Sequence, residues 1–98
     1  MTFEKIYELL KEKAALANPI GGTLKFNFED GYVYLDGSGH ANTVSKEDKE
    51  ADCTVKVSQE NFAKVINGQL NPTMAFMMGQ IKLDGDMSVA MKLQSLLG

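Results

Sequence analysis

Residues 24 to 35 carry the pattern of a β-hairpin. Apolar and polar side chains alternate from Leu24 to Phe28, which is the period of a strand with one buried face. Asp30 and Gly31 follow, a pair that favours a tight turn between strands, and aromatic and β-branched residues resume from Tyr32 to Leu35. The segment therefore predicts two antiparallel strands joined by a short turn.

Helical and strand periods succeed one another in the rest of the chain. Apolar residues recur at helical spacing from Phe3 to Ala17, and the proline and glycines that follow end this first helix. After the hairpin, a short polar strand is expected from His40 to Ser45, then a charged, solvated turn. The remaining expected elements are a strand from Cys53 to Val57, a helix after Ser58, a short helix opened by Asn71 and Pro72, a strand at Ile81 to Asp84 and a final helix ending at Leu97.

The order of these elements predicts an α+β fold. Strands grouped together, with helices at both ends, favour a five-stranded, mostly antiparallel sheet with helices over one face. A chain of 98 residues supports one hydrophobic core, so residues 1–98 are expected to form a single domain.

Charge and hydropathy exclude several classes of function. The formal net charge of -3 leaves no basic surface for nucleic acid. The apolar runs are shorter than the roughly 20 residues of a transmembrane helix, and the N-terminal segment lacks the pattern of a signal peptide. With a single cysteine, the chain forms no internal disulfide, which favours a reducing compartment. We expect a cytoplasmic location.

The residues best suited to catalysis lack the neighbours that catalysis needs. His40 has no second ligand, base or orienting group at a meaningful spacing. Cys53 shares the apolar side of its strand with Val55, which predicts inert packing. Glu47, Asp48, Glu50 and Asp52 form an acidic cluster, but Lys46 and Lys49 interleave with it and favour a solvated turn over a calcium site. We expect no enzyme activity, no metal and no cofactor.

The chain concentrates its methionines in one segment. Five of the six lie between Met74 and Met91. Methionine is flexible and polarizable, so such a cluster suits an apolar surface that fits ligands of different shapes. It equally suits a core filled with adaptable side chains, because apolar residues at helical spacing usually pack against the fold. From the residues alone, both interpretations stay open.

Several short motifs follow one another in the second half of the chain. They are ADCTV at Ala51 to Val55, the pair Asn71 and Pro72, the pair Ala75 and Phe76, G-x-I-K-x-x-G-x-M from Gly79 to Met87, and MKLQ at Met91 to Gln94. In this order they resemble the sterol carrier protein type 2 family. The first half is similar to the family more loosely, through its glycine-containing turns.

This resemblance implies non-catalytic binding and carriage or presentation of lipid. In that family the sheet and the helices enclose an apolar tunnel that takes fatty acids, acyl-CoA esters, sterols or phospholipids. The resemblance thus favours the ligand interpretation of the methionines, with Gln94 near a headgroup at the tunnel mouth. The expected ligand-binding residues are Phe76, Met77, Met78, Ile81, Met87, Met91, Leu93 and Gln94.

A second interpretation makes the Met-rich face a surface that docks a lipid-metabolising enzyme. The two differ in whether lipid co-purifies with the protein. Peroxisomal members of the family end in a tripeptide such as Ser-Lys-Leu, whereas this chain ends in Leu96, Leu97 and Gly98, which favours the cytoplasm. The physiological lipid, the protein partner and any transient membrane contact stay open.

Overall fold

A computed structural model describes residues 1–97, apart from the side chains of Gln94, Ser95 and Leu97. The helices and strands follow one another in the predicted order. They are α1 (Phe3–Leu16), β1 (Thr23–Phe28), β2 (Gly31–Asp36), β3 (Thr43–Ser45), β4 (Cys53–Val57), α2 (Gln59–Ile66), α3 (Pro72–Met77), β5 (Ile81–Gly85) and α4 (Met87–Leu97).

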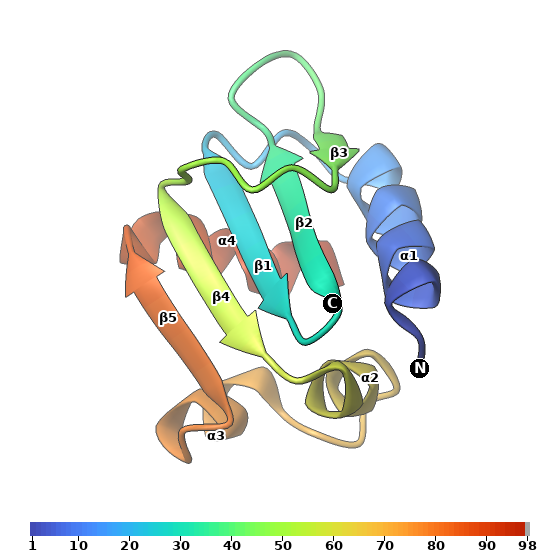
Figure 1. The fold of residues 1–98 in the computed structure, drawn as a ribbon. Helices are drawn as coiled ribbons and strands as arrows, with labels where there is room; N and C mark the ends of the chain where they lie inside the picture. The colour runs from blue at the N-terminus through green and yellow to red at the C-terminus, as the bar shows by residue number, and fades with distance from the viewer. Residues whose placement is uncertain (98) are drawn as a thin grey trace.

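The strands form one mixed sheet in the order β3-β2-β1-β4-β5 (Figure 1). The predicted hairpin is present, with Leu24 opposite Leu35 and Phe28 opposite Gly31. Every neighbouring pair is antiparallel except β1 with β4, which is parallel. The predicted α+β class and the mostly antiparallel sheet are confirmed.

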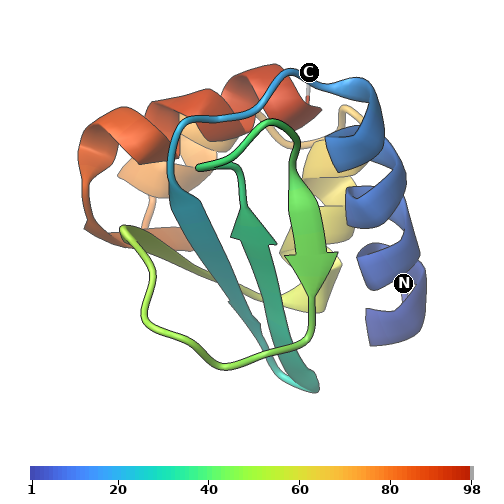
Figure 2. The same ribbon diagram turned by 90° about the horizontal axis from the view of Figure 1, so that it is seen from above.

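The two faces of the sheet have different covers. Figure 2 shows the helices on one side and the connection between β3 and β4, residues 46–52, running across the other. The Nζ atom of Lys25 lies 2.8 Å from a carboxylate oxygen of Asp48, and the hydroxyl of Tyr34 donates to the Glu50 carbonyl over 3.4 Å. The charged segment is therefore an extended crossover, where a solvated turn was predicted, and it is what allows β4 to lie parallel to β1.

The strand predicted over residues 40–45 begins only at Thr43. Asn42 takes part in the loop instead, because its side-chain amide holds the end of α1. Its Nδ2 donates to the Ala14 carbonyl over 3.1 Å, and its Oδ1 accepts from the Ile20 backbone N–H over 3.1 Å. These buried backbone groups gain partners, and the chain from residue 40 to 42 does not join the sheet.

The hydrophobic core lies between the inner face of the sheet and the helices. Three aromatic rings make its centre, with Phe26 stacked on Phe28 at 6.1 Å and Phe62 edge-on to Phe28 at 5.2 Å between ring centroids. The helices contribute unequally. Whereas α1 and α4 each bury several apolar side chains, α3 buries Ala75 alone. The short helix α3 is consequently the one held least firmly to the core.

Candidate ligand-binding groove

An apolar groove of about 150 Å³ lies between α3, the edge strand β5 and α4. Its floor is buried and its rim is open to solvent. The lining residues are Pro72, Thr73 and Phe76 from α3, Ile81 and Leu83 from β5, and Met87, Ala90, Met91 and Leu93 from α4.

Local periodicity brings these side chains to one place. On β5, Ile81 and Leu83 point to the helix side of the sheet, and Lys82 between them points to the other side. On α4, Met87, Ala90 and Met91 are three and four positions apart and share one face of the helix. A strand and two helices thus present their apolar faces to the same space.

The sharp turn from β5 to α4 fixes the two walls relative to each other. Gly85 has φ +117°, and a Cβ at this position would collide with the carbonyl oxygen of Asp52. The Asp86 carboxylate caps α4 by accepting from the backbone N–H of Ser88 over 2.9 Å and from its hydroxyl over 2.6 Å. These hydrogen bonds hold the pKa of Asp86 below its usual value.

Most of the expected ligand-binding residues meet in the groove. Ile81 and Leu93 lie in its floor, and Phe76, Met87 and Met91 form an exposed rim. Large apolar side chains are unusual in such exposed positions, and Met91 leaves 74% of its surface open to solvent. The assignment of these residues to a ligand stays a prediction, which the groove makes specific.

The other expected residues lie elsewhere. Met77 and Met78 are on the outward side of α3, away from the groove lining, with 75% and 65% of their surfaces exposed. The side chain of Gln94 lies outside the part of the chain that the structure describes. Sequence reasoning also missed four lining residues, Pro72, Thr73, Leu83 and Ala90. Strand parity with Ile81 and helical spacing from Met87 would have indicated Leu83 and Ala90.

The structure shows an open groove at this side of the core, and the tunnel that the family resemblance implies stays a prediction. Phe26, Phe28 and Phe62 pack together between the sheet and the helices. The groove is smaller than the roughly 300 to 1,000 Å³ of typical small-molecule sites. A long ligand therefore requires the groove to widen.

Cys53 and His40, the residues considered for catalysis, do not line the groove. Cys53 is fully buried in the sheet, and this burial raises the pKa of its thiol. His40 is exposed in the loop before β3. Among the residues that the structure describes, no group of three His, Cys, Asp or Glu side chains is placed to hold a metal ion.

We expect Cys53 to resist alkylation in the folded protein, because the thiol is inaccessible and its raised pKa disfavours the reactive thiolate. Mass spectrometry after treatment with iodoacetamide should show unmodified protein in buffer and full modification in denaturant. Equal rates of modification in the two conditions would contradict the buried, inert assignment of this residue.

Comparison with known proteins identifies the family to which this chain is similar. A family model described as "SCP-2 sterol transfer family" matches residues 3–98. The chain belongs to this family. The resemblance predicted from the sequence motifs is confirmed, and the SCP-2 family supports lipid binding and transfer as the general class of function.

Curated SCP-2 relatives are longer than this chain. Human sterol carrier protein 2 is 33% identical over 104 residues, which cover 98% of this chain and 19% of the human protein. Hydroxysteroid dehydrogenase-like protein 2 of Xenopus tropicalis is 34% identical over 108 residues, which cover 99% of this chain and 24% of that protein. The chain thus corresponds to one SCP-2 segment of each relative.

The SCP-2 fold is also seen in a solved structure with similar sequence. The sterol carrier protein domain 2 of Helicoverpa armigera superimposes with a TM-score of 0.78 at 28% identity, over 95% of this chain and 83% of that one.

In the described part of our SCP-2 chain, every helix is too short or too polar to cross a membrane.

Proposed function

We propose that residues 1–98 act as one SCP-2 domain that binds the acyl chain or sterol-like body of a lipid in the groove between α3, β5 and α4, and carries it without catalysis. The groove is the observation that carries this proposal. Its floor is apolar and buried, and its open rim consists of Phe76, Met87 and Met91. Fatty acids, acyl-CoA esters, sterols and phospholipids share the apolar body that such a site accepts.

Burial of the ligand supplies the affinity. Each methylene taken from water contributes about 0.8 kcal/mol, so a chain of about twelve carbons contributes roughly 10 kcal/mol before the costs of ordering and association. Association costs at least about 4 kcal/mol, so twelve carbons leave at most about 6 kcal/mol, and a chain of about sixteen carbons is needed for micromolar affinity, about -8 kcal/mol. The flexible methionines of the rim support ligands of different shapes.

The groove would widen by movement of α3 away from β5. This helix buries Ala75 alone, whereas the neighbouring α4 buries Val89, Ala90 and Leu93. Gly68 and Gly79 flank the α3 segment with φ of +75° and +79°, and open space surrounds both. Moving α3 away from β5 therefore costs less than moving α4, and it opens the floor of the groove.

Filling the groove should remove ligand binding and leave the fold intact. Thr73 is exposed on the groove side of α3, where its backbone N–H donates to the Asn71 side chain and its hydroxyl makes no hydrogen bond to another described group. In Thr73→Trp the indole would occupy the space of the ligand and weaken fatty-acid affinity by roughly tenfold or more. Exposed substitutions usually change stability by less than about 0.5 kcal/mol. Displacement of a fluorescent long-chain fatty acid measures the affinity, and thermal unfolding checks the fold.

Thr54→Trp is the matched control, because Thr54 lies on the other face of the sheet. It should bind fatty acid as the original chain does. If Thr73→Trp also binds unchanged, the ligand is not in this groove. If the original chain binds no fatty acid or other lipid at any chain length, lipid carriage itself is wrong.

A further inference from the structure

The methionines of the chain all lie outside the hydrophobic core. They are Met1, Met74, Met77, Met78, Met87 and Met91. The least exposed of them, Met1, leaves 43% of its surface open to solvent. The core of the described residues consists of aliphatic and aromatic side chains, with Cys53 as its one sulfur-containing residue. Because methionine is ordinarily among the residue types that proteins bury, this separation of the thioethers from the core is unusual.

Exposure decides which sulfur atoms an oxidant can reach. A thiol reacts as the thiolate, and burial both shields Cys53 and raises the pKa of its thiol. A thioether has no proton to lose, so its oxidation by a peroxide depends on access to the side chain. In the folded protein, the methionines are therefore the sulfur groups that are open to oxidation.

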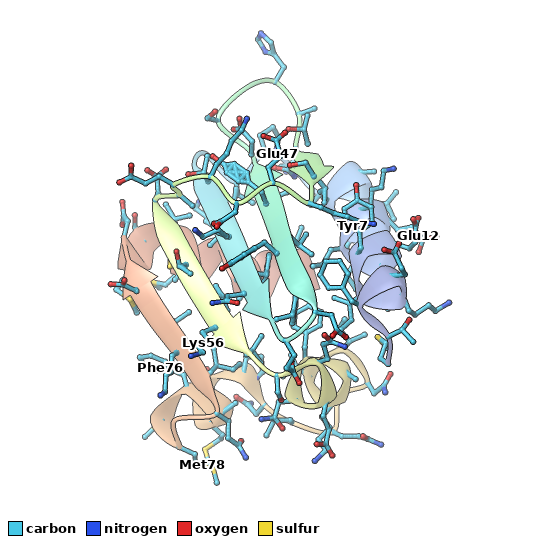
Figure 3. The ribbon with its side chains drawn as sticks, in the orientation of Figure 1. Tyr7, Glu12, Glu47, Lys56, Phe76 and Met78 are labelled. Carbon is cyan, nitrogen blue, oxygen red and sulfur yellow. The ribbon has the colours of Figure 1, made fainter. Side chains whose placement is uncertain are left out.

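The methionines fall into two groups by their position relative to the groove. Met87 and Met91 lie four positions apart on α4 and belong to the groove lining. Met77 and Met78 lie on α3, outside the lining. Figure 3 shows this difference within α3, where Met78 projects away from the fold and Phe76 projects toward the β5 side, where the groove lies. Oxidation of the α4 pair thus changes the groove, and oxidation of the α3 pair changes a separate surface.

A sulfoxide at the rim of the groove opposes the burial of a lipid. Oxidation converts the apolar thioether into a polar group whose oxygen accepts hydrogen bonds. In the empty groove, water reaches this oxygen at Met91. A bound acyl chain would displace the water, and among the lining residues that the structure describes, Thr73 alone has a polar side chain to replace it. The sulfoxide is consequently compatible with the fold and unfavourable for the ligand.

We infer that Met87 and Met91 form an oxidation site through which a peroxide controls lipid binding. The thioether sulfur attacks one oxygen of hydrogen peroxide, so that an S–O bond forms and the O–O bond breaks. The sulfur loses an electron pair to the peroxide, and the departing hydroxide takes the remaining proton and leaves as water. A methionine sulfoxide reductase restores the thioether. This inference rests on the proposed function, since the property that changes is the affinity of the groove for lipid.

Fatty-acid affinity before and after treatment of the full chain with hydrogen peroxide tests this inference. Displacement of a fluorescent long-chain fatty acid should show roughly tenfold or more weaker binding once Met87 and Met91 are sulfoxides, and the reductase should restore it. Thermal unfolding should change little, because the described core contains no methionine. Unchanged affinity with both sulfoxides mapped by mass spectrometry would overturn the inference, and so would unfolding of the oxidised chain.

Leucine variants assign the effect to the groove. Leucine is similar to methionine in volume and takes up no oxygen, so each variant is compared with itself before and after peroxide. In Met87→Leu with Met91→Leu, the affinity should stay close to its own untreated value. Met77→Leu with Met78→Leu is the matched control outside the groove lining, and peroxide should weaken its binding as much as that of the original chain. Equal losses in the two variants would place the sensitive residue elsewhere and overturn the assignment.

A bound lipid should in turn protect the α4 pair. An acyl chain in the groove covers Met87 and Met91, and binding and oxidation are linked, so each disfavours the other. Saturating fatty acid should slow the oxidation of Met87 and Met91 and leave the rates at Met77 and Met78 unchanged. Mass spectrometry of peptides from timed samples measures each rate. Equal rates with and without fatty acid at all four positions would contradict the inference.

Binding by the untreated chain separates this inference from the carrier function. If the untreated and the oxidised chain bind fatty acid equally, control by oxidation is wrong and lipid carriage stands. If the untreated chain binds no fatty acid or other lipid at any chain length, both proposals are wrong.

Discussion

Replacing Leu83 with aspartate should weaken fatty-acid binding by about a hundredfold or more. Leu83 is half-buried in the lining of the groove, on the side of β5 that faces the helices. A bound acyl chain would strip water from the new carboxylate and leave it without a partner, at a cost of several kcal/mol. Each 1.4 kcal/mol corresponds to about tenfold in affinity. Displacement titrations with a fluorescent fatty acid measure the loss.

Leu83→Asn isolates the effect of charge, because asparagine has the size of aspartate and is neutral. It should lose the apolar contact of leucine and bind about tenfold more weakly, while Leu83→Asp loses more. Thermal unfolding should show similar stability for the two variants without ligand. Equal ligand affinities for the two would mean that the acyl chain does not cover Leu83.

Phe26→Ala should destabilise the fold more than any surface change. Phe26 is fully buried at the centre of the sheet, stacked on Phe28 and edge-on to Phe62 at 5.8 Å between ring centroids. Removing a buried phenylalanine costs about 3 to 5 kcal/mol, a large part of the roughly 5 to 15 kcal/mol that stabilises a typical domain. The melting temperature should fall by roughly 12 °C or more for a chain of this size. Calorimetry or circular dichroism measures it.

Tyr32→Ala provides the comparison for Phe26→Ala within the same hairpin. Tyr32 lies on the outer face of the sheet, opposite Asn27, with the Nζ atom of Lys25 5.3 Å from its ring centroid. Its loss should cost about 1 kcal/mol. A Phe26 variant as stable as the Tyr32 variant would show that the aromatic centre of the core is packed differently.

The parts of the fold that depend on near neighbours in the sequence were predictable. The hairpin needs only the alternation of side chains and the turn at Asp30 and Gly31. The short helix α3 needs Asn71, whose side-chain oxygen accepts from the backbone N–H groups of Thr73 and Met74, and Pro72 in its first turn. These signals act within a few residues, so they can be recognised in the sequence without knowledge of the tertiary structure.

Features that depend on distant partners were not predictable. The loop at Asn42 is set by acceptors and donors 22 to 28 residues earlier in the chain. The parallel pairing of β1 with β4 follows from the route of residues 46–52 across the sheet. The alternation of apolar and polar side chains does not indicate this route. For the candidate site, apolar character indicated a region in which the structure has a groove, and its use as a ligand site stays a prediction. Only the orientation of α3 separates Phe76 in the groove from Met77 and Met78 outside it.

The two edges of the sheet bear on how the protein behaves at high concentration. β3 is three residues long and lies beside α1, where the Tyr7 hydroxyl donates to the Val44 carbonyl over 3.5 Å. At the other edge, β5 alternates its apolar residues with Lys82 and Asp84. Short, covered or charged edges oppose the addition of a strand from another molecule. The backbone therefore resists fibrillar aggregation, even though the α3 end keeps its apolar side chains exposed.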